Sequence, residues 1–171
     1  MKETALAGLI AAVYVVLGLA FLPISFGVYQ VRVAEALTVL PFLTRAAIPG
    51  LFVGCLLANV FGGMGWQDIV FGSLLTLIAA ILTRTVFLLS RRLQERQVVA
   101  SDTFGVVIAP LPPVLINAFG VSAYLAPILG FGYWFSVQMI GVGQLISCYA
   151  LGLPLLKLMQ KRGWLLSESS R

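Results

Sequence analysis

The sequence contains no histidine, and this absence narrows the chemistry that the protein can perform. Histidine is the commonest general base of enzymes at neutral pH and the commonest metal ligand. Ser–His and Cys–His pairs for nucleophilic catalysis are therefore excluded. The motifs GxxxxGK(S/T), HExxH and GxSxG are absent as well, so no P-loop, zinc-protease or serine-hydrolase signature is present. We expect a chain that is not an enzyme and that uses no cofactor or metal ion.

Charge is also scarce, because only 10% of the 171 residues are charged. In contrast, 60% are hydrophobic and the mean hydropathy is +1.04. A soluble globular domain is about 25% charged and about 45–50% apolar, so the composition indicates a membrane protein. No basic stripe with interleaved aromatic residues is present, and nucleic acid is not an expected partner. The two cysteines, Cys55 and Cys148, lack CxxC spacing and are expected to be small buried hydrophobic residues.

Six apolar segments are long enough, or nearly so, to span a bilayer, which takes about 20 helical residues. The predicted segments are 4–22, 33–42, 46–61, 69–89, 104–125 and 132–159. The second and third are short, and either thin the bilayer locally or lie sheltered by neighbouring helices. The prolines of the fifth segment are expected to break its helix. The sequence thus predicts an all-α membrane protein, a single domain over residues 1–171 that forms a bundle of six transmembrane helices.

The basic residues predict the orientation of this bundle in the cell membrane. Cytoplasmic loops carry an excess of lysine and arginine. With the N-terminus inside, six crossings place the following residues on the cytoplasmic side: Arg45, Arg91, Arg92, Arg96, Lys157, Lys161 and Arg162. Arg32 is then the only basic residue near the outer face. We therefore expect both termini to be cytoplasmic.

Polar residues within apolar surroundings are the candidates for a ligand site, because ionisable groups at membrane depth are costly and usually functional. Arg32 and Glu35 either pair with each other along one helical face or contact a ligand. Asp68 either caps the fourth helix or contacts a ligand, and Trp66 is either an interface anchor or a binding residue. Asn117 follows the prolines of the fifth segment, where irregular backbone can line a cavity. The full set of candidates is Tyr29, Arg32, Glu35, Asn59, Trp66, Asp68, Asn117, Trp134, Gln138 and Gln144.

Small residues recur at four-residue spacing in several segments, which lets helices pack closely in lipid. The third segment contains Gly50 and Gly54, whose expected role is packing within the bundle. The first segment contains the pairs Ala7–Ala11 and Gly8–Ala12. Packing within the bundle is possible there too, but an edge helix has a free side, and we expect this stripe to face another protein.

Several blocks of the sequence resemble the QueT family. They are VYQVRVAEALTVLPFLTRAAIPGLFVGCLLANVFGG, DIVFGSLLTLIAAILT, PLPPVLINAF and GVGQLISCYALGLPLL, and the resemblance covers about residues 5–156. That family comprises substrate-binding S components of energy-coupling factor (ECF) transporters, implicated in the uptake of queuosine precursors. The resemblance implies a six-helix bundle with an outward-facing site for a 7-deazaguanine base. The sequence departs from the family pattern at Gln144, where many relatives are expected to have an acidic residue.

The resemblance also implies partners, namely a membrane coupling subunit and two cytoplasmic ATPase subunits. Ala7, Gly8, Ala11 and Ala12 would then dock on the coupling subunit. In the site, Glu35 would accept from the ring N–H and amino groups, and the ring would stack on Tyr29, Trp66 or Trp134. A cationic substituent on the base would favour Glu35 or Asp68. Two alternatives remain open: an S component for another small vitamin-like solute, or a membrane scaffold that transports nothing.

Overall fold

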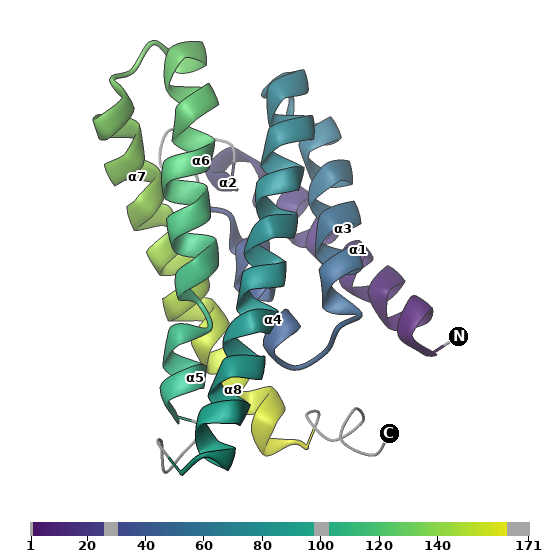
Figure 1. Ribbon diagram of the computed structural model, residues 1–171. Helices are drawn as coiled ribbons and strands as arrows, with labels where there is room; N and C mark the ends of the chain where they lie inside the picture. Colours follow the sequence, from purple (N-terminus) through teal and green to yellow (C-terminus); the bar gives the residue numbers. More distant parts are fainter. Residues whose placement is uncertain (1, 26–30, 98–102, 164–171) are drawn as a thin grey trace.

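The computed structural model describes residues 2–25, 31–97 and 103–163, and the regular elements within these ranges are all helical (Figure 1). In chain order they are α1 (Lys2–Ala20), α2 (Leu22–Ser25), the 3-10 helix η1 (Val33–Phe42), α3 (Ala47–Gly62), the π-helical segment η2 (Asp68–Gly72), α4 (Ser73–Glu95), α5 (Thr103–Ile108), α6 (Leu111–Leu129), α7 (Tyr133–Leu145), the π-helical segment η3 (Ile146–Gly152) and α8 (Leu153–Lys161). The structure confirms an all-helical membrane bundle.

Four of the helical stretches are long and apolar enough to cross a membrane. They are Lys2–Ala20, Asp68–Glu95, Thr103–Leu129 and Tyr133–Lys161, because η2 continues into α4, α5 adjoins α6, and η3 joins α7 to α8. The two shorter apolar helices are η1 and α3. Each predicted segment therefore corresponds to a helical stretch, and 33–42 coincides with η1. The number of crossings remains a prediction.

The predicted break in the fifth segment lies at Ala109 and Pro110, between α5 and α6. Two further prolines follow in the first turn of α6, where the missing backbone N–H would have had no helical acceptor. The break also releases a carbonyl group, and Thr83 of α4 donates its hydroxyl to the Ala109 carbonyl at 3.3 Å. The break is thus stabilised by a neighbouring helix rather than left with an unsatisfied acceptor.

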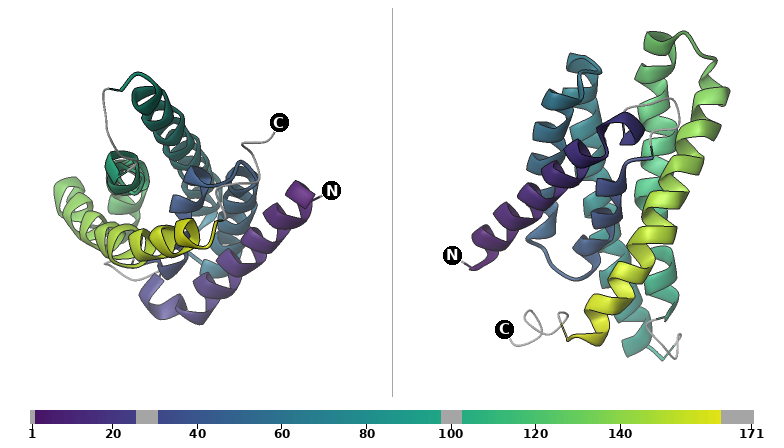
Figure 2. Two further views of the ribbon diagram at one scale, coloured as in Figure 1. Left: turned by 90° about the horizontal axis from the view of Figure 1, so that it is seen from below. Right: turned by 180° about the vertical axis from the view of Figure 1, so that it is seen from behind.

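The short helix η1 lies at the centre of the bundle. All of its residues from Ala34 to Phe42 are buried, and α1, α3, α4, η3 and α8 pack around it. Figures 1 and 2 show α1 crossing the bundle obliquely on one side. Runs of 3-10 helix longer than three or four residues are uncommon, so the surrounding helices hold η1 in this form. Of the two expectations for this short segment, the structure shows sheltering by neighbours.

Helices α1 and α3 pack closely because α3 carries glycine at two positions that face α1. A Cβ atom at Gly50 would lie 2.7 Å from the Ala7 carbonyl oxygen, and one at Gly54 would lie 2.8 Å from Tyr14 Cβ. Any larger residue would therefore push the two backbones apart. The glycine stripe of α3 packs inside the bundle, as expected from its spacing.

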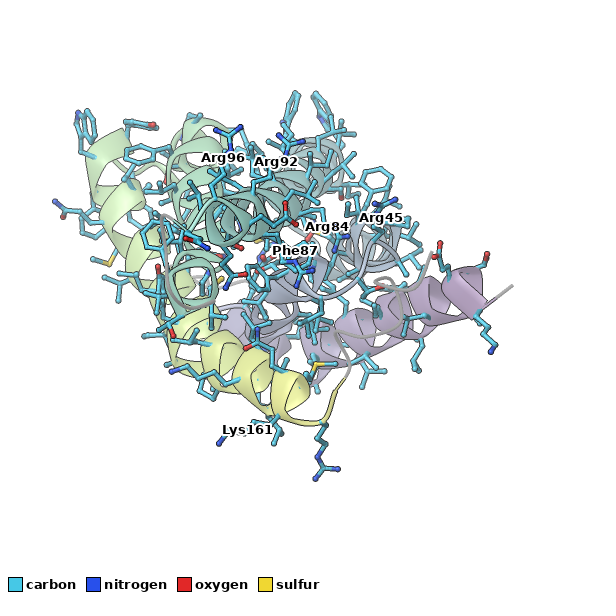
Figure 3. The ribbon with its side chains drawn as sticks, turned by 60° about the horizontal axis from the view of Figure 1, so that its bottom comes forward. Arg45, Arg84, Phe87, Arg92, Arg96 and Lys161 are labelled. Carbon is cyan, nitrogen blue, oxygen red and sulfur yellow. The ribbon has the colours of Figure 1, made fainter. Side chains whose placement is uncertain are left out.

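One end of the bundle carries exposed basic residues. Helix α1 begins and α8 ends at this end, where α4 also ends and α5 begins (Figure 1). Figure 3 views the molecule with this end turned forward and labels Arg45, Arg92, Arg96 and Lys161, all of them exposed. Arg84 is buried instead. Its guanidinium lies 4.6 Å from the centre of the Phe87 ring and donates to the Pro41 carbonyl at 3.5 Å, beside the end of η1.

Candidate functional site

A cluster of buried polar side chains lies beside η1, away from the basic end. We call it the polar cluster, and it consists of Tyr14, Arg32, Glu35, Asn59, Asp68, Asn117 and Gln144. These residues come from α1, the start of η1, α3, η2, α6 and α7. Each is less than a tenth exposed. Such a concentration of polar groups inside an apolar bundle is expensive unless the groups are paired or serve a ligand.

The first half of the polar cluster is built on an ion pair between Arg32 and Asp68. Arg32 Nη2 lies 2.9 Å from Asp68 Oδ2 and 3.1 Å from Oδ1, and its Nη1 donates to Asn59 Oδ1 at 3.0 Å. The amide of Asn59 in turn donates to the Asp68 carbonyl at 2.8 Å. Tyr124 donates its hydroxyl to Asp68 Oδ1 at 2.5 Å. In this half, the positive charge of Arg32 and the negative charge of Asp68 therefore neutralise each other.

This arrangement corrects two sequence-based alternatives. Arg32 forms an ion pair with Asp68, whereas the sequence argument paired it with Glu35 along one helical face. Arg32 has the extended backbone of an N-cap residue, with φ −82° and ψ 98°, so it does not share the helical face of Glu35. The capping role of Asp68 is wrong, because the helix already begins at Trp66 and the Asp68 carboxylate is bound by Arg32 and Tyr124.

The second half of the polar cluster surrounds the Glu35 carboxylate. Tyr14 donates its hydroxyl to Glu35 Oε1, and Asn117 Nδ2 donates to Glu35 Oε2 at 3.2 Å. The same Asn117 nitrogen also donates to Gln144 Oε1 at 3.2 Å. Asn117 Oδ1 is buried and has no hydrogen-bond partner among the described residues. Two neutral side chains thus donate to the Glu35 carboxylate, beside an Asn117 oxygen without a partner in the described part of the chain.

A small cavity lies between the two halves. It contains about 190 Å³ of empty space and is lined by Arg32, Glu35, Gly72, Thr76, Asn117, Val121 and Gln144. Gly72 is needed there because a Cβ atom would lie 2.9 Å from Asn59 Nδ2 and 3.0 Å from Asp68 Oδ1. This empty space is too narrow to hold a water molecule. A ligand can enter only if the surrounding helices move apart.

Six of the ten candidate binding residues meet in the polar cluster: Arg32, Glu35, Asn59, Asp68, Asn117 and Gln144. Three others lie outside the polar cluster. Trp66 and Trp134 are 62% and 69% exposed, which fits interface anchors, and Gln138 is exposed on α7. Tyr29 lies outside the described residues.

Sequence reasoning missed Tyr14, whose hydroxyl holds Glu35. It lies in the middle of the apolar helix α1, far from the membrane boundary where tyrosine normally gathers. That position was a usable signal, because a buried tyrosine hydroxyl needs a hydrogen-bond partner.

The small-residue stripe of α1 is divided between two faces. Ala11 is buried and Ala7 half-buried against the glycines of α3. Gly8 and Ala12 are exposed, and a Cβ atom at Gly8 would have no heavy atom within 4 Å. Only the Gly8–Ala12 half of the stripe is therefore free to meet a partner.

Comparison with known proteins gives one match. A family model described as QueT transporter matches residues 4–161, which include all but the first two residues of the described helices. No curated protein and no solved structure matches the chain.

Proposed function

Because the chain belongs to the QueT transporter family, we propose that it is the substrate-binding S component of an ATP-driven ECF-type transporter. Membership of a transporter family and the four long apolar helices establish a multi-pass membrane protein with a non-enzymatic role. The proposal goes further, in assigning the polar cluster as the binding site for a 7-deazaguanine queuosine precursor. The observation that carries it is the buried carboxylate of Glu35 beside Asn117 Oδ1, which has no hydrogen-bond partner in residues 2–25, 31–97 and 103–163.

The chemistry of the polar cluster suits a base of this kind. A 7-deazaguanine presents several N–H donors and one carbonyl acceptor on its edges. The cluster offers acceptors at Glu35, Asn117 Oδ1 and Gln144 Oε1, and donors on the two amide groups. In the closed site, Tyr14 and Asn117 occupy the positions around Glu35 that ligand donors would take. Binding then exchanges internal hydrogen bonds for ligand hydrogen bonds of similar strength.

The proposed orientation places six crossings in the cell membrane and both termini in the cytoplasm. It is supported by the exposed basic residues at the end where α1 begins and α8 ends (Figure 3). Asp68 begins η2 directly after the connection from α3, at the opposite end of the bundle (Figure 1). The polar cluster therefore lies toward the outer side, from which an uptake system receives its substrate.

Partners are part of the proposal, because the chain has no nucleotide-binding loop of its own. A membrane coupling subunit and two ATPase subunits would supply the energy. The proposed docking surface is the exposed Gly8–Ala12 face of α1. Beside it is an apolar hollow of about 390 Å³ formed by α1, η1 and α8, which includes Leu9, Val13, Leu37 and Leu155.

The two glutamines of α7 provide a matched test of the site. Purified protein is screened by thermal shift against deazaguanines and vitamins, and the hit is then titrated calorimetrically. We expect Gln144→Ala to weaken deazaguanine binding by about 5- to 100-fold, as for loss of a buried hydrogen bond. The control Gln138→Ala should retain wild-type affinity, because Gln138 is exposed on the same helix.

The other outcomes would each indicate a different function or a different binding site. A shift with a different vitamin-like solute, and none with deazaguanines, would assign another cargo. No ligand-dependent shift at all would favour a scaffold. Equal affinity of the Gln144→Ala and Gln138→Ala variants would place the site outside the polar cluster.

A further inference from the structure

We infer that Tyr124 of α6 is the gating residue of the polar cluster, and that its hydrogen bond to Asp68 must break before a substrate can enter the small cavity. Tyr124 is not a member of the polar cluster, and the proposed binding chemistry does not use it. The inference rests on the proposed function, because it concerns how a substrate reaches the same site. Tyr124 is a positioning residue in this role, since it acts through Asp68 and α6 rather than on the substrate.

The two halves of the polar cluster lie at different depths in the bundle. Helix α6 runs toward the end opposite the basic residues (Figure 1), and Tyr124 lies seven residues beyond Asn117, which is about 10 Å farther out at about 1.5 Å per residue. Arg32 precedes η1, and Glu35 lies about 6 Å farther in at about 2.0 Å per residue of 3-10 helix. The half that contains Arg32 therefore covers the outer side of the cavity, and the half around Glu35 lines its inner side.

Tyr124 ties α6 to this outer half. Arg32, Asn59 and Asp68 already join the start of η1 to α3 and η2 through hydrogen bonds of 2.8–3.1 Å. In the described part of the chain, α6 adds one hydrogen bond to this network, from the Tyr124 hydroxyl to Asp68 Oδ1 at 2.5 Å. Breaking that bond releases α6 from the outer half and leaves the ion pair of Arg32 and Asp68 in place.

The Tyr124 side chain also occupies the boundary between η2 and α6. Its hydroxyl would lie 3.0 Å from a Cβ atom at Gly72, which lines the cavity. Its ring lies 5.9 Å from that of Phe71, which is exposed. Tyr124 itself is half-buried, so its side chain stands between the cavity and the surface of the bundle. An outward movement of Tyr124 therefore opens a path into the cavity between η2 and α6.

A second, independent observation is that α6 is weakened next to Tyr124. Pro127 lies inside the helix, three residues farther toward its end. Proline has no N–H, so the hydrogen bond to the carbonyl of Ala123 is missing. Gly130 then ends the helix in the left-handed conformation, with φ 72°. The outer end of α6 thus moves away from η2 more easily than a regular helix would.

Removing one oxygen atom tests the gate. Full-length wild type and Tyr124→Phe are mixed with 7-aminomethyl-7-deazaguanine, and stopped-flow tryptophan fluorescence measures the association and dissociation rates. The gate closes over the empty and the loaded cavity alike, so both rates should rise about 10- to 100-fold, the range for a hydrogen bond to a charged group. The dissociation constant should therefore stay unchanged. Tyr133→Phe is the matched control and should keep wild-type rates, because the Tyr133 hydroxyl donates to the Phe119 carbonyl at an exposed position.

The outcomes separate the inference from the proposed function. Wild-type binding combined with unchanged rates in Tyr124→Phe would overturn the inference and leave the proposed function intact. A weaker affinity of Tyr124→Phe at an unchanged association rate would also overturn it, because Tyr124 would then support the site or contact the substrate. Failure of wild type to bind the compound would overturn both.

A reversible cross-link between α4 and α6 tests the same movement, and it remains decisive even if Tyr124→Phe does not fold. A Cβ atom at Gly120 would lie 3.3 Å from the Leu75 side chain, so cysteines at these two positions can form a disulfide. The native Cys55 and Cys148 are buried. Oxidised Leu75→Cys/Gly120→Cys protein should bind the compound at least about tenfold more slowly than the same protein after reduction, since binding requires the helices to separate. Equal rates would rule out this movement of α6.

Discussion

Replacing Arg32 with methionine destabilises the folded protein by about 3–5 kcal/mol, the loss found when one partner of a buried ion pair is removed. Asp68 is completely buried and would keep its charge without its cation. Asn59 would lose its donor at the same time. Thermal unfolding in detergent measures the effect, which amounts to about 6–20 °C if each kcal/mol corresponds to about 2–4 °C. Arg92→Met is the matched control, because Arg92 is exposed, and should unfold within about 1–2 °C of wild type.

A double substitution shows whether the broken ion pair itself causes the loss of stability in Arg32→Met. Asp68→Asn removes the second charge but retains an oxygen that can accept from Tyr124. Combined with Arg32→Met, it should recover part of the lost stability, since no buried charge then remains unpaired. If the two substitutions instead add their losses, or if Arg32→Met unfolds together with Arg92→Met, the ion pair does not stabilise this site.

If the chain docks on an ECF module as proposed, we expect Gly8→Leu to disrupt that assembly and to leave binding of the proposed ligand intact. Gly8 lies on the exposed face of α1 with open space around it, so the leucine fits the isolated chain. A partner helix that approaches a glycine closely has no room for four additional carbon atoms. We expect at least a tenfold loss of the coupling and ATPase subunits that co-purify with the tagged chain, with unchanged calorimetric affinity for the deazaguanine.

Two further variants test whether the exposed face of α1 is the one that docks on the partner. Ala11→Leu is expected to unfold the chain rather than only uncouple it, because Ala11 backbone atoms lie 3.1 Å from a Cβ position at Gly54. Ala123→Leu is the control on an exposed face of α6 and should leave co-purification unchanged. Normal assembly of Gly8→Leu would rule out this face as the docking surface.

Local patterns in the sequence predicted the parts of the fold that depend on local physics. Each predicted apolar run corresponds to a helical stretch of the structure, although the short helix α2 was not predicted, and the missing N–H of proline located the break at Pro110. Polar residues in apolar runs also identified Glu35 and Asn117 as site candidates. The identification of these two residues follows from the cost of burying polar groups in lipid. This cost acts on each residue independently of the rest of the fold.

The partners of these residues could not be predicted in the same way, because they come from distant segments. Glu35 is 82 positions from Asn117, and Arg32 is 36 from Asp68. The i,i+3 argument for Arg32 and Glu35 requires both residues to be helical, whereas Arg32 is extended. Trp134 illustrates the same limit, since its type suits both a stacking wall and a membrane interface. Only the packing of α7 shows that it lies on the exposed side.

Mass spectrometry of the small molecule that the protein retains after purification tests the binding site most directly. Wild-type protein and Glu35→Ala are expressed together with the ECF subunits, purified identically and denatured to release any ligand. If the polar cluster binds the proposed ligand, wild type should release a 7-deazaguanine in near-stoichiometric amount and Glu35→Ala little or none. Release of a different compound from wild type, or of equal amounts from both proteins, would contradict it.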